Sequence, residues 1–134
     1  MIDFQYINCK KLPLKLSSKW LHSIILAEGK KLGEIVYVFC NDAYLLKKNI
    51  EFLNHNTLTD IITFDYCKKD IISGDILISI ERVKDNSRTY GVEFLTELDR
   101  VMVHGLLHLL EYKDKTKEEI KTMRAKENYY LSIK

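Results

Sequence analysis

One segment, from about Val92 to Leu110, restricts the fold of this chain more than any other. On a helical projection, large apolar side chains surround its second half. They are Val101, Met102, Val103, Leu106, Leu107, Leu109 and Leu110. A helix that is apolar on all sides is buried in the protein interior. The sequence therefore predicts a long helix inside the core.

Around this helix, the chain shows short apolar runs typical of strands and longer stretches with helical periodicity. Strands are expected at about 2–7, 35–40, 61–66 and 72–80, and helices at about 17–30, 41–53, 81–88 and 116–131. The run 35–40, Ile-Val-Tyr-Val-Phe-Cys, is typical of a strand at the centre of a sheet. Gly74 and Asp75 are expected to break the last strand, through a bulge or a close approach. Because helices and strands mix without strict alternation, we expect an α+β fold with a mixed four-stranded sheet packed with helices.

Two of these helices carry signals for how they begin and pack. Asn41 and Asp42 can cap the helix that ends near residue 53. Thr116 and Glu119 form a capping box at the start of the last helix. In the former helix Leu46, Ile50 and Leu53 lie on one side, and in the latter Ile120, Met123 and Tyr130 form the predicted buried stripe.

Composition indicates one globular domain, residues 1–134. The chain is 46% hydrophobic and 30% charged, and a chain of this length buries enough surface to form a core without disulfides. Cys9, Cys40 and Cys67 are scattered, which favours small core side chains in a reducing compartment. Neither a signal peptide nor an apolar run long enough to cross a membrane is visible, so we expect a soluble cytoplasmic protein that does not bind membranes.

The net charge of +2 argues against a protein that coats nucleic acid by bulk charge. The charge is unevenly spread, however, at +4 over residues 1–50, −5 over 51–112 and +3 over 113–134. An enzyme that binds RNA through basic flanks around an acidic centre is compatible with this distribution.

His104 and His108 lie four residues apart on the buried helix, so both imidazoles project from one face. Such a pair can consist of two core histidines satisfied by ordinary hydrogen bonds. Polar rings on an otherwise apolar helix must both be satisfied in the dry interior, however, and one divalent cation does this for both at once. This favours a metal site.

A catalytic zinc site needs a third protein ligand and an open position. Asp114 follows His108 by six residues, just past the expected helix end, where the chain can turn back. Taken alone, Asp114 is a typical surface charge, and only its offset from the two histidines makes it a candidate ligand.

These residues resemble a known family. The segment His104-Gly-Leu-Leu-His108-Leu-Leu-Glu-Tyr-Lys-Asp114 is similar to the H-G-x-L-H-L-x-G-Y-D-H signature of the YbeY family of metal-dependent endoribonucleases. Residues 59–64, Thr-Asp-Ile-Ile-Thr-Phe, resemble the family's T-D-V-L-S-F strand, and residues 74–79, Gly-Asp-Ile-Leu-Ile-Ser, resemble its G-D-I-x-I-S strand. The order and spacing match across nearly the whole chain.

The resemblance implies a zincin-like metal-binding helix and one Zn²⁺ per chain, held by His104, His108 and Asp114, which act in catalysis through the bound metal. It also implies a single-strand-specific endoribonuclease that matures the 3′ end of small-subunit ribosomal RNA and takes part in ribosome quality control. Its expected partners are ribosomal RNA and the small ribosomal subunit, and no DNA. The oligomeric state stays open.

Three positions depart from the family pattern. Asp114 replaces the usual histidine, and because a carboxylate weakens the Lewis acidity of the metal, another divalent cation such as manganese is an alternative. Glu111 replaces a glycine at which the helix is expected to end in a left-handed conformation, at a cost of about 1 kcal/mol. The loop before Thr59 is short and lacks the family's usual arginine. His55 in this loop is either a phosphate-binding residue or an exposed histidine without a role.

Other functions remain as alternatives. A zincin peptidase needs a glutamate after the first histidine as general base, and Gly105 stands there, so proteolysis is disfavoured. A non-catalytic ribosome-assembly module would fit the departures at Asp114 and Glu111, and a hydrolase of a small phosphate ester would fit the modest charge. For phosphodiester cleavage, cations at the site would stabilise the transition state. The candidates are Arg82, Arg88, Arg100 and Arg124.

Overall fold

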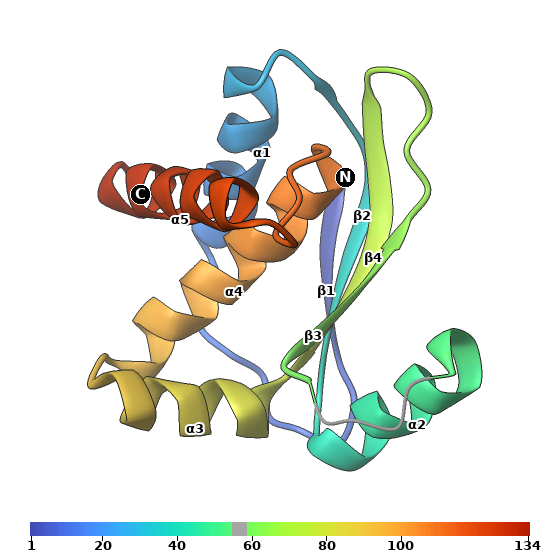
Figure 1. Cartoon of the computed structure of the whole chain (residues 1–134). Helices are drawn as coiled ribbons and strands as arrows, with labels where there is room; N and C mark the ends of the chain where they lie inside the picture. The colour runs from blue at the N-terminus through green and yellow to red at the C-terminus, as the bar shows by residue number, and fades with distance from the viewer. Residues whose placement is uncertain (55–58) are drawn as a thin grey trace.

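In the computed structural model, which describes residues 1–54 and 59–134, four strands form one mixed sheet and five helices pack around it (Figure 1). Along the chain the elements are β1 (Ile2–Tyr6), α1 (Ser17–Ala27), β2 (Lys31–Cys40), α2 (Asp42–Leu53), β3 (Ile61–Asp65), β4 (Ile71–Ser79), α3 (Ile80–Tyr90), α4 (Phe94–Leu109) and α5 (Lys117–Ser132). Helices α1, α3, α4 and α5 lie on one side of the sheet and α2 lies on the other (Figure 1). The predicted α+β class and the four-stranded mixed sheet are confirmed.

The sheet has the strand order β1-β2-β4-β3, with β1, β2 and β4 parallel and β3 antiparallel to β4. The predicted central strand lies inside the sheet as β2, where Ile35, Tyr37 and Phe39 are fully buried. The strand begins at Lys31 rather than at residue 35, because Lys31 and Leu32 already pair with β4 before an irregularity in the register. The apolar run in the sequence marks only its buried half.

Strand β4 continues through Gly74 and Asp75, so the predicted break in the strand itself is wrong, but its register with β2 shifts between the pairs Leu32–Ile72 and Ile35–Gly74, as a bulge would produce. The alternative of a close approach is confirmed. A Cβ atom on Gly74 would lie 2.4 Å from the carbonyl oxygen of Phe64 and 2.9 Å from Cδ2 of Leu109. The missing side chain therefore lets the end of α4 rest directly on the sheet.

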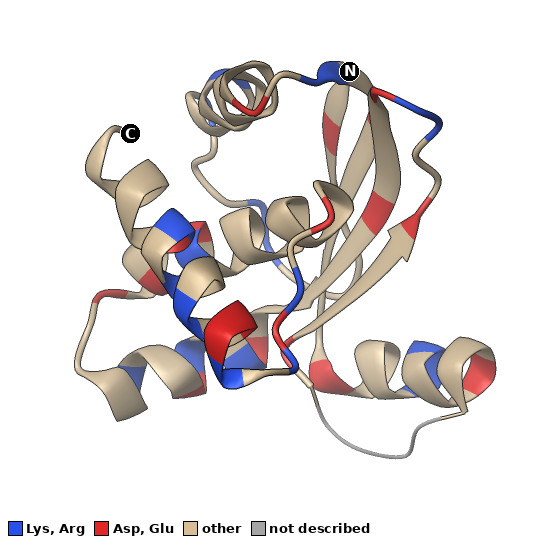
Figure 2. Ribbon diagram, turned by 45° about the horizontal axis from the view of Figure 1, so that its top comes forward, with Lys and Arg blue, Asp and Glu red and all other residues tan. Residues whose placement is uncertain are grey.

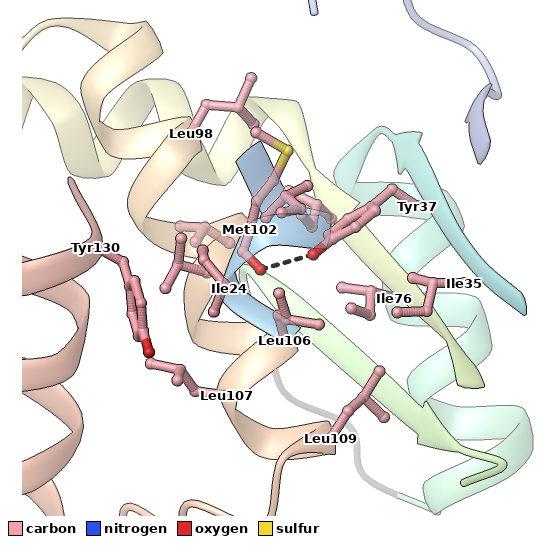
Figure 3. Close-up of a cluster of buried hydrophobic side chains, with 14 of the residues drawn as sticks. Ile24, Ile35, Tyr37, Ile76, Leu98, Met102, Leu106, Leu107, Leu109 and Tyr130 are labelled. Carbon is pink, nitrogen blue, oxygen red and sulfur yellow. Dashed lines mark hydrogen bonds between the residues drawn. The ribbon is translucent and has the colours of Figure 1, made fainter. Parts of the chain in front are cut away.

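Helix α4 is buried between the sheet and the outer helices, as predicted. The hydroxyl of Tyr37 on β2 donates a hydrogen bond of 2.9 Å to the backbone carbonyl of Met102 (Figure 3). Ile24 from α1 and Tyr130 from α5 belong to the same cluster of buried side chains (Figure 3). Buried apolar contacts and the hydrogen bond of Tyr37 thus hold α4 from several directions.

Helix α2 packs against the face of the sheet opposite to α4 (Figure 1). Asn41 caps it, accepting a hydrogen bond from the Tyr44 backbone N–H. Its buried residues are Leu45 and Asn49, whereas Ile50 is 46% exposed. The side of α2 that carries Leu46, Ile50 and Leu53 is therefore not the side that faces the sheet. Leu45 packs with Val38, Cys40, Ile62 and Leu77, and the ring of Phe52 lies 5.8 Å from that of Phe64 on β3.

Helix α5 begins with the predicted capping box, in which both hydrogen bonds between Thr116 and Glu119 are formed. Met123 and Tyr130 are buried as predicted, but Ile120 is 51% exposed. The third buried residue of this helix is Glu127. Within residues 1–54 and 59–134, no helix is long and apolar enough to cross a membrane.

Candidate metal centre

The end of α4 and the segment after it bring the three predicted ligands together. Nε2 of His104 lies 3.0 Å from Nε2 of His108, and Oδ2 of Asp114 lies 3.3 Å from the former and 3.4 Å from the latter. The side chains of His104 and His108 are 24% and 28% exposed, and that of Asp114 is 40% exposed. The triad therefore sits at the edge of the core, not in the dry interior that the sequence suggested.

The spacing of these three atoms fits a tetrahedral cation. Zinc binds histidine nitrogen and carboxylate oxygen at about 2.0–2.2 Å, which places tetrahedral ligands about 3.3–3.5 Å apart. The three observed separations of 3.0–3.4 Å lie at or just below this range. The triad could thus hold a metal ion and leave the fourth position open.

Helix α5 fixes the orientation of His104. Nδ1 of His104 lies 2.8 Å from Oε2 of Glu127, a carboxylate that is only 3% exposed. Since a carboxylate only accepts hydrogen bonds, Nδ1 must carry the proton, and the lone pair of Nε2 faces the other two ligand atoms. The other oxygen of Glu127 accepts a hydrogen bond of 3.1 Å from Arg100.

The charges around Glu127 shift two pKa values. Burial raises the pKa of Glu127, but its hydrogen bond to His104 and the guanidinium groups of Arg100 and Arg124 outweigh burial and hold the pKa below its ordinary value. Burial lowers the pKa of His104, but the hydrogen bond and negative charge of Glu127 outweigh it and raise the pKa. Both shifts favour an ionised carboxylate behind His104.

A backbone carbonyl plays the corresponding part for His108. Helix α4 ends in a Schellman motif, in which the N–H of Tyr112 donates to the carbonyl of Leu107 and the N–H of Glu111 donates to that of His108, both at 3.0 Å. Glu111 has a φ of 75°, so the predicted left-handed helix end is confirmed. This turn places the carbonyl of Tyr112 3.0 Å from Nδ1 of His108, which therefore also carries its proton on Nδ1.

Glu127 is not among the site residues predicted from the sequence. A signal was present, because Glu127 follows Met123 by four residues and precedes Tyr130 by three, and so shares their buried face. A carboxylate on such a face requires a partner. The partner, His104, could be identified only from the packing of α5 against α4.

The four arginine candidates separate into two groups. Arg82 forms ion pairs with Asp42 and Asp85, and Arg88 lies near Asp85, so both belong to a charge cluster around α3. Arg100 and Arg124 lie beside the triad, through Glu127. The Arg124 side chain is 58% exposed, whereas that of Arg100 is 24% exposed and also donates to Asn128. His55 lies outside the described residues.

Gly105 marks where α4 rests on the sheet. A Cβ atom at this position would lie 2.8 Å from Cδ1 of Ile61 and 2.9 Å from Cγ2 of Ile76. The position after the first histidine therefore faces the packed sheet and has no space for a glutamate. This geometry agrees with the sequence-based argument against a zincin peptidase.

Comparisons with known proteins identify relatives along the whole chain. A family model described as "Endoribonuclease YbeY" matches residues 5–133. A protein of Flavobacterium johnsoniae named "Endoribonuclease YbeY" is 49% identical over 134 residues, which cover 99% of this chain and 96% of the relative. A Porphyromonas gingivalis protein of the same name is 44% identical over 125 residues, covering 93% and 83% of the two chains.

A solved structure also matches. The solution structure of the protein TM1509 from Thermotoga maritima superposes with a TM-score of 0.70 at 24% sequence identity, covering 96% of this chain and 86% of that protein. This similarity supports the fold.

Proposed function

The chain belongs to the YbeY endoribonuclease family, and from this premise we propose that it is a zinc-dependent endoribonuclease that cleaves single-stranded RNA during ribosomal RNA maturation. Its substrate would be the 3′ end of the small-subunit ribosomal RNA precursor, on or near the small ribosomal subunit in the cytoplasm. A part in ribosome quality control would use the same activity.

The observation that carries this proposal is the convergence of His104, His108 and Asp114, whose ligand atoms lie 3.0–3.4 Å apart. One Zn²⁺ per chain would bind there. Asp114 makes this donor set harder than one with three histidines, so Mn²⁺ is the alternative cation.

A bound divalent cation would supply the Lewis acid that polarises the phosphoryl group. The protein itself contributes orientation and charge. Glu127 and the carbonyl of Tyr112 hold protons on Nδ1 of His104 and His108, which directs both Nε2 lone pairs to one point. The exposed guanidinium of Arg124 can bind a phosphate oxygen and stabilise the charge that develops during cleavage.

The openness of the centre favours a polymer over a small phosphate ester. Sites for small molecules are usually concave and enclose most of the ligand. All three triad side chains are between 24% and 40% exposed, and a large groove of about 760 Å³ lies elsewhere, between α1 and α5. Lys and Arg are frequent along α5 and in the segment that leads to it (Figure 2), where a phosphate backbone could bind.

Metal analysis and RNA cleavage test the proposal together. We expect the purified protein to hold about one zinc per chain and to process a small-subunit ribosomal RNA precursor, and His108→Ala to lose both. His22→Ala, which changes another half-buried histidine on α1, is the control and should keep both properties.

The alternatives give different results. If the wild type holds no stoichiometric metal and processes RNA no better than His108→Ala, the proposal is wrong. Ribosome association that survives His104→Ala, without cleavage by the wild type, would favour the assembly module. Rapid turnover of a mononucleotide analogue without competition by RNA would favour a small-ester hydrolase.

A further inference from the structure

A cluster of polar side chains next to the metal centre has no role in the proposed chemistry. The carboxylate of Glu28, at the end of α1, accepts hydrogen bonds from three donors that are 84 to 102 residues away in sequence. They are the hydroxyl of Tyr112 at 2.5 Å, the ammonium of Lys126 at 3.1 Å and the hydroxyl of Tyr130. One acidic side chain thus joins α1, α5 and the segment between α4 and α5.

This cluster is tightly formed. The Glu28 side chain is 13% exposed and Tyr130 is 2% exposed. The ammonium of Lys126 also lies 5.6 Å from the ring centre of Tyr112 and 5.9 Å from that of Tyr130. Burial raises the pKa of Glu28, but its three donors outweigh burial and lower the pKa, which keeps the carboxylate charged. Charge-assisted hydrogen bonds of this kind hold their donors more firmly than neutral ones.

Tyr112 connects the cluster to the metal centre. Its hydroxyl donates a hydrogen bond to Glu28, and its backbone carbonyl oxygen lies 3.0 Å from Nδ1 of His108. Asp114 follows two residues later. Its side chain is half-exposed, and its ion pairs within the described residues are those to the two histidines.

The segment that carries Asp114 is short and anchored at both ends. At one end Tyr112 is fixed by the Schellman motif and by Glu28. At the other end Thr116 is fixed by the capping box with Glu119. Lys113 and Lys115, which flank Asp114, are exposed. A shift of Tyr112 would therefore move the carbonyl that orients His108 and the start of the segment that places Asp114.

We propose that Glu28 and Tyr112 are positioning residues for metal binding: the hydrogen bond between their side chains sets the orientation of His108 and the placement of Asp114. The inference rests on the proposed metal site, because it assigns the cluster a role at that site. A purely structural role would stabilise the fold without changing the affinity for the metal.

The test measures metal affinity rather than activity. Zn²⁺ binding to the metal-free full chain is followed by competition with a chromophoric chelator, for the wild type, Glu28→Gln and Tyr112→Phe. Loss of a group behind a metal ligand typically costs 10- to 100-fold in affinity, and we expect about tenfold for either variant, because the carbonyl of Tyr112 itself remains. The double variant should lose no more than the larger single loss, because both changes act on the same hydrogen bond: Tyr112→Phe removes its donor, and Glu28→Gln replaces its charged acceptor by a neutral amide oxygen.

Asp99→Asn is the matched control. Asp99 is 15% exposed and pairs with Lys134 at 2.9 Å, so it resembles Glu28 in burial and in its lysine partner. The Asp99→Asn protein should bind Zn²⁺ with the affinity of the wild type. Absorption of the Co²⁺-loaded proteins provides a second readout, which should change in Glu28→Gln and Tyr112→Phe and not in the control.

The outcomes separate this inference from the proposed function. If the wild type binds one zinc and both variants bind it equally well, with an unchanged Co²⁺ spectrum, the positioning role is overturned and the metal site stands, even if both variants melt at lower temperature. If the wild type itself binds no metal, the proposed function fails and the inference fails with it. Should Glu28→Gln not fold, Tyr112→Phe, which removes one hydroxyl, decides the question by itself.

Discussion

The two histidines of α4 lie one helical turn apart, yet they are supported in different ways. Behind His104 stands a buried side chain, Glu127, which reaches it from α5 and is paired with Arg100. Behind His108 stands a backbone carbonyl, that of Tyr112, which the helix end itself delivers. His104 is thus oriented by a buried, ionised carboxylate, whereas His108 is oriented by the backbone of the turn that follows α4.

This difference determines how each histidine can be disturbed. Replacing Glu127 removes, in one step, the charged acceptor for Nδ1 of His104. No substitution removes the carbonyl of Tyr112, so the orientation of His108 can be weakened only by moving the turn or by loosening what holds it. A single substitution behind His104 should therefore weaken zinc binding more than a single substitution in the turn behind His108.

The largest effect is expected from Glu127→Gln. The amide keeps the shape of the side chain but removes the charge that pairs with His104 and Arg100, so we expect Zn²⁺ affinity to fall about 10- to 100-fold. Chelator competition measures this loss. Glu118→Gln, an exposed change on the same helix, should bind zinc like the wild type. Equal affinities for all three proteins would show that the carboxylate behind His104 is not needed.

A smaller effect, a gain in stability rather than a loss of zinc affinity, is expected from Glu111→Gly. Glu111 has a φ of 75°, a conformation that glycine adopts without strain, so the substitution should stabilise the metal-free protein by about 1 kcal/mol. Urea unfolding measures the change. Because the Schellman hydrogen bonds remain, zinc affinity should stay within about twofold. A large loss of affinity would mean that the glutamate side chain, and not the turn, supports His108.

The smallest expected effect is a difference between the wild type and Glu28→Gln in how stability depends on pH. The folded-state pKa of Glu28 lies below its ordinary value, so its contribution to stability is present above the unfolded carboxyl pKa of about 4.3 and is lost as the pH falls through the folded-state pKa. We therefore expect the metal-free wild type to lose more stability than Glu28→Gln between pH 6 and pH 3. Thermal unfolding across this range measures the difference. Parallel curves for the two proteins would contradict a stabilised carboxylate at position 28.

Much of the scaffold could be predicted because it depends on local patterns. The apolar surround of α4, the strand at the centre of the sheet and the capping box at Thr116 each reflect the geometry of a single element. The errors lie where an element meets its neighbours. Ile120 on α5 fits a helical stripe in the sequence, yet it is about half exposed because the helix packs along Met123, Glu127 and Tyr130.

The sequence by itself determined that His104 and His108 share one face of a buried helix, since a separation of four residues fixes this in any α-helix, and it placed Asp114 within reach just past the helix end. Only the tertiary structure decided what orients these candidate ligands. Glu127 lies 23 residues from His104 and Glu28 lies 84 residues from Tyr112. Contacts across such separations arise when α1 and α5 pack onto α4, and backbone periodicity carries no information about them.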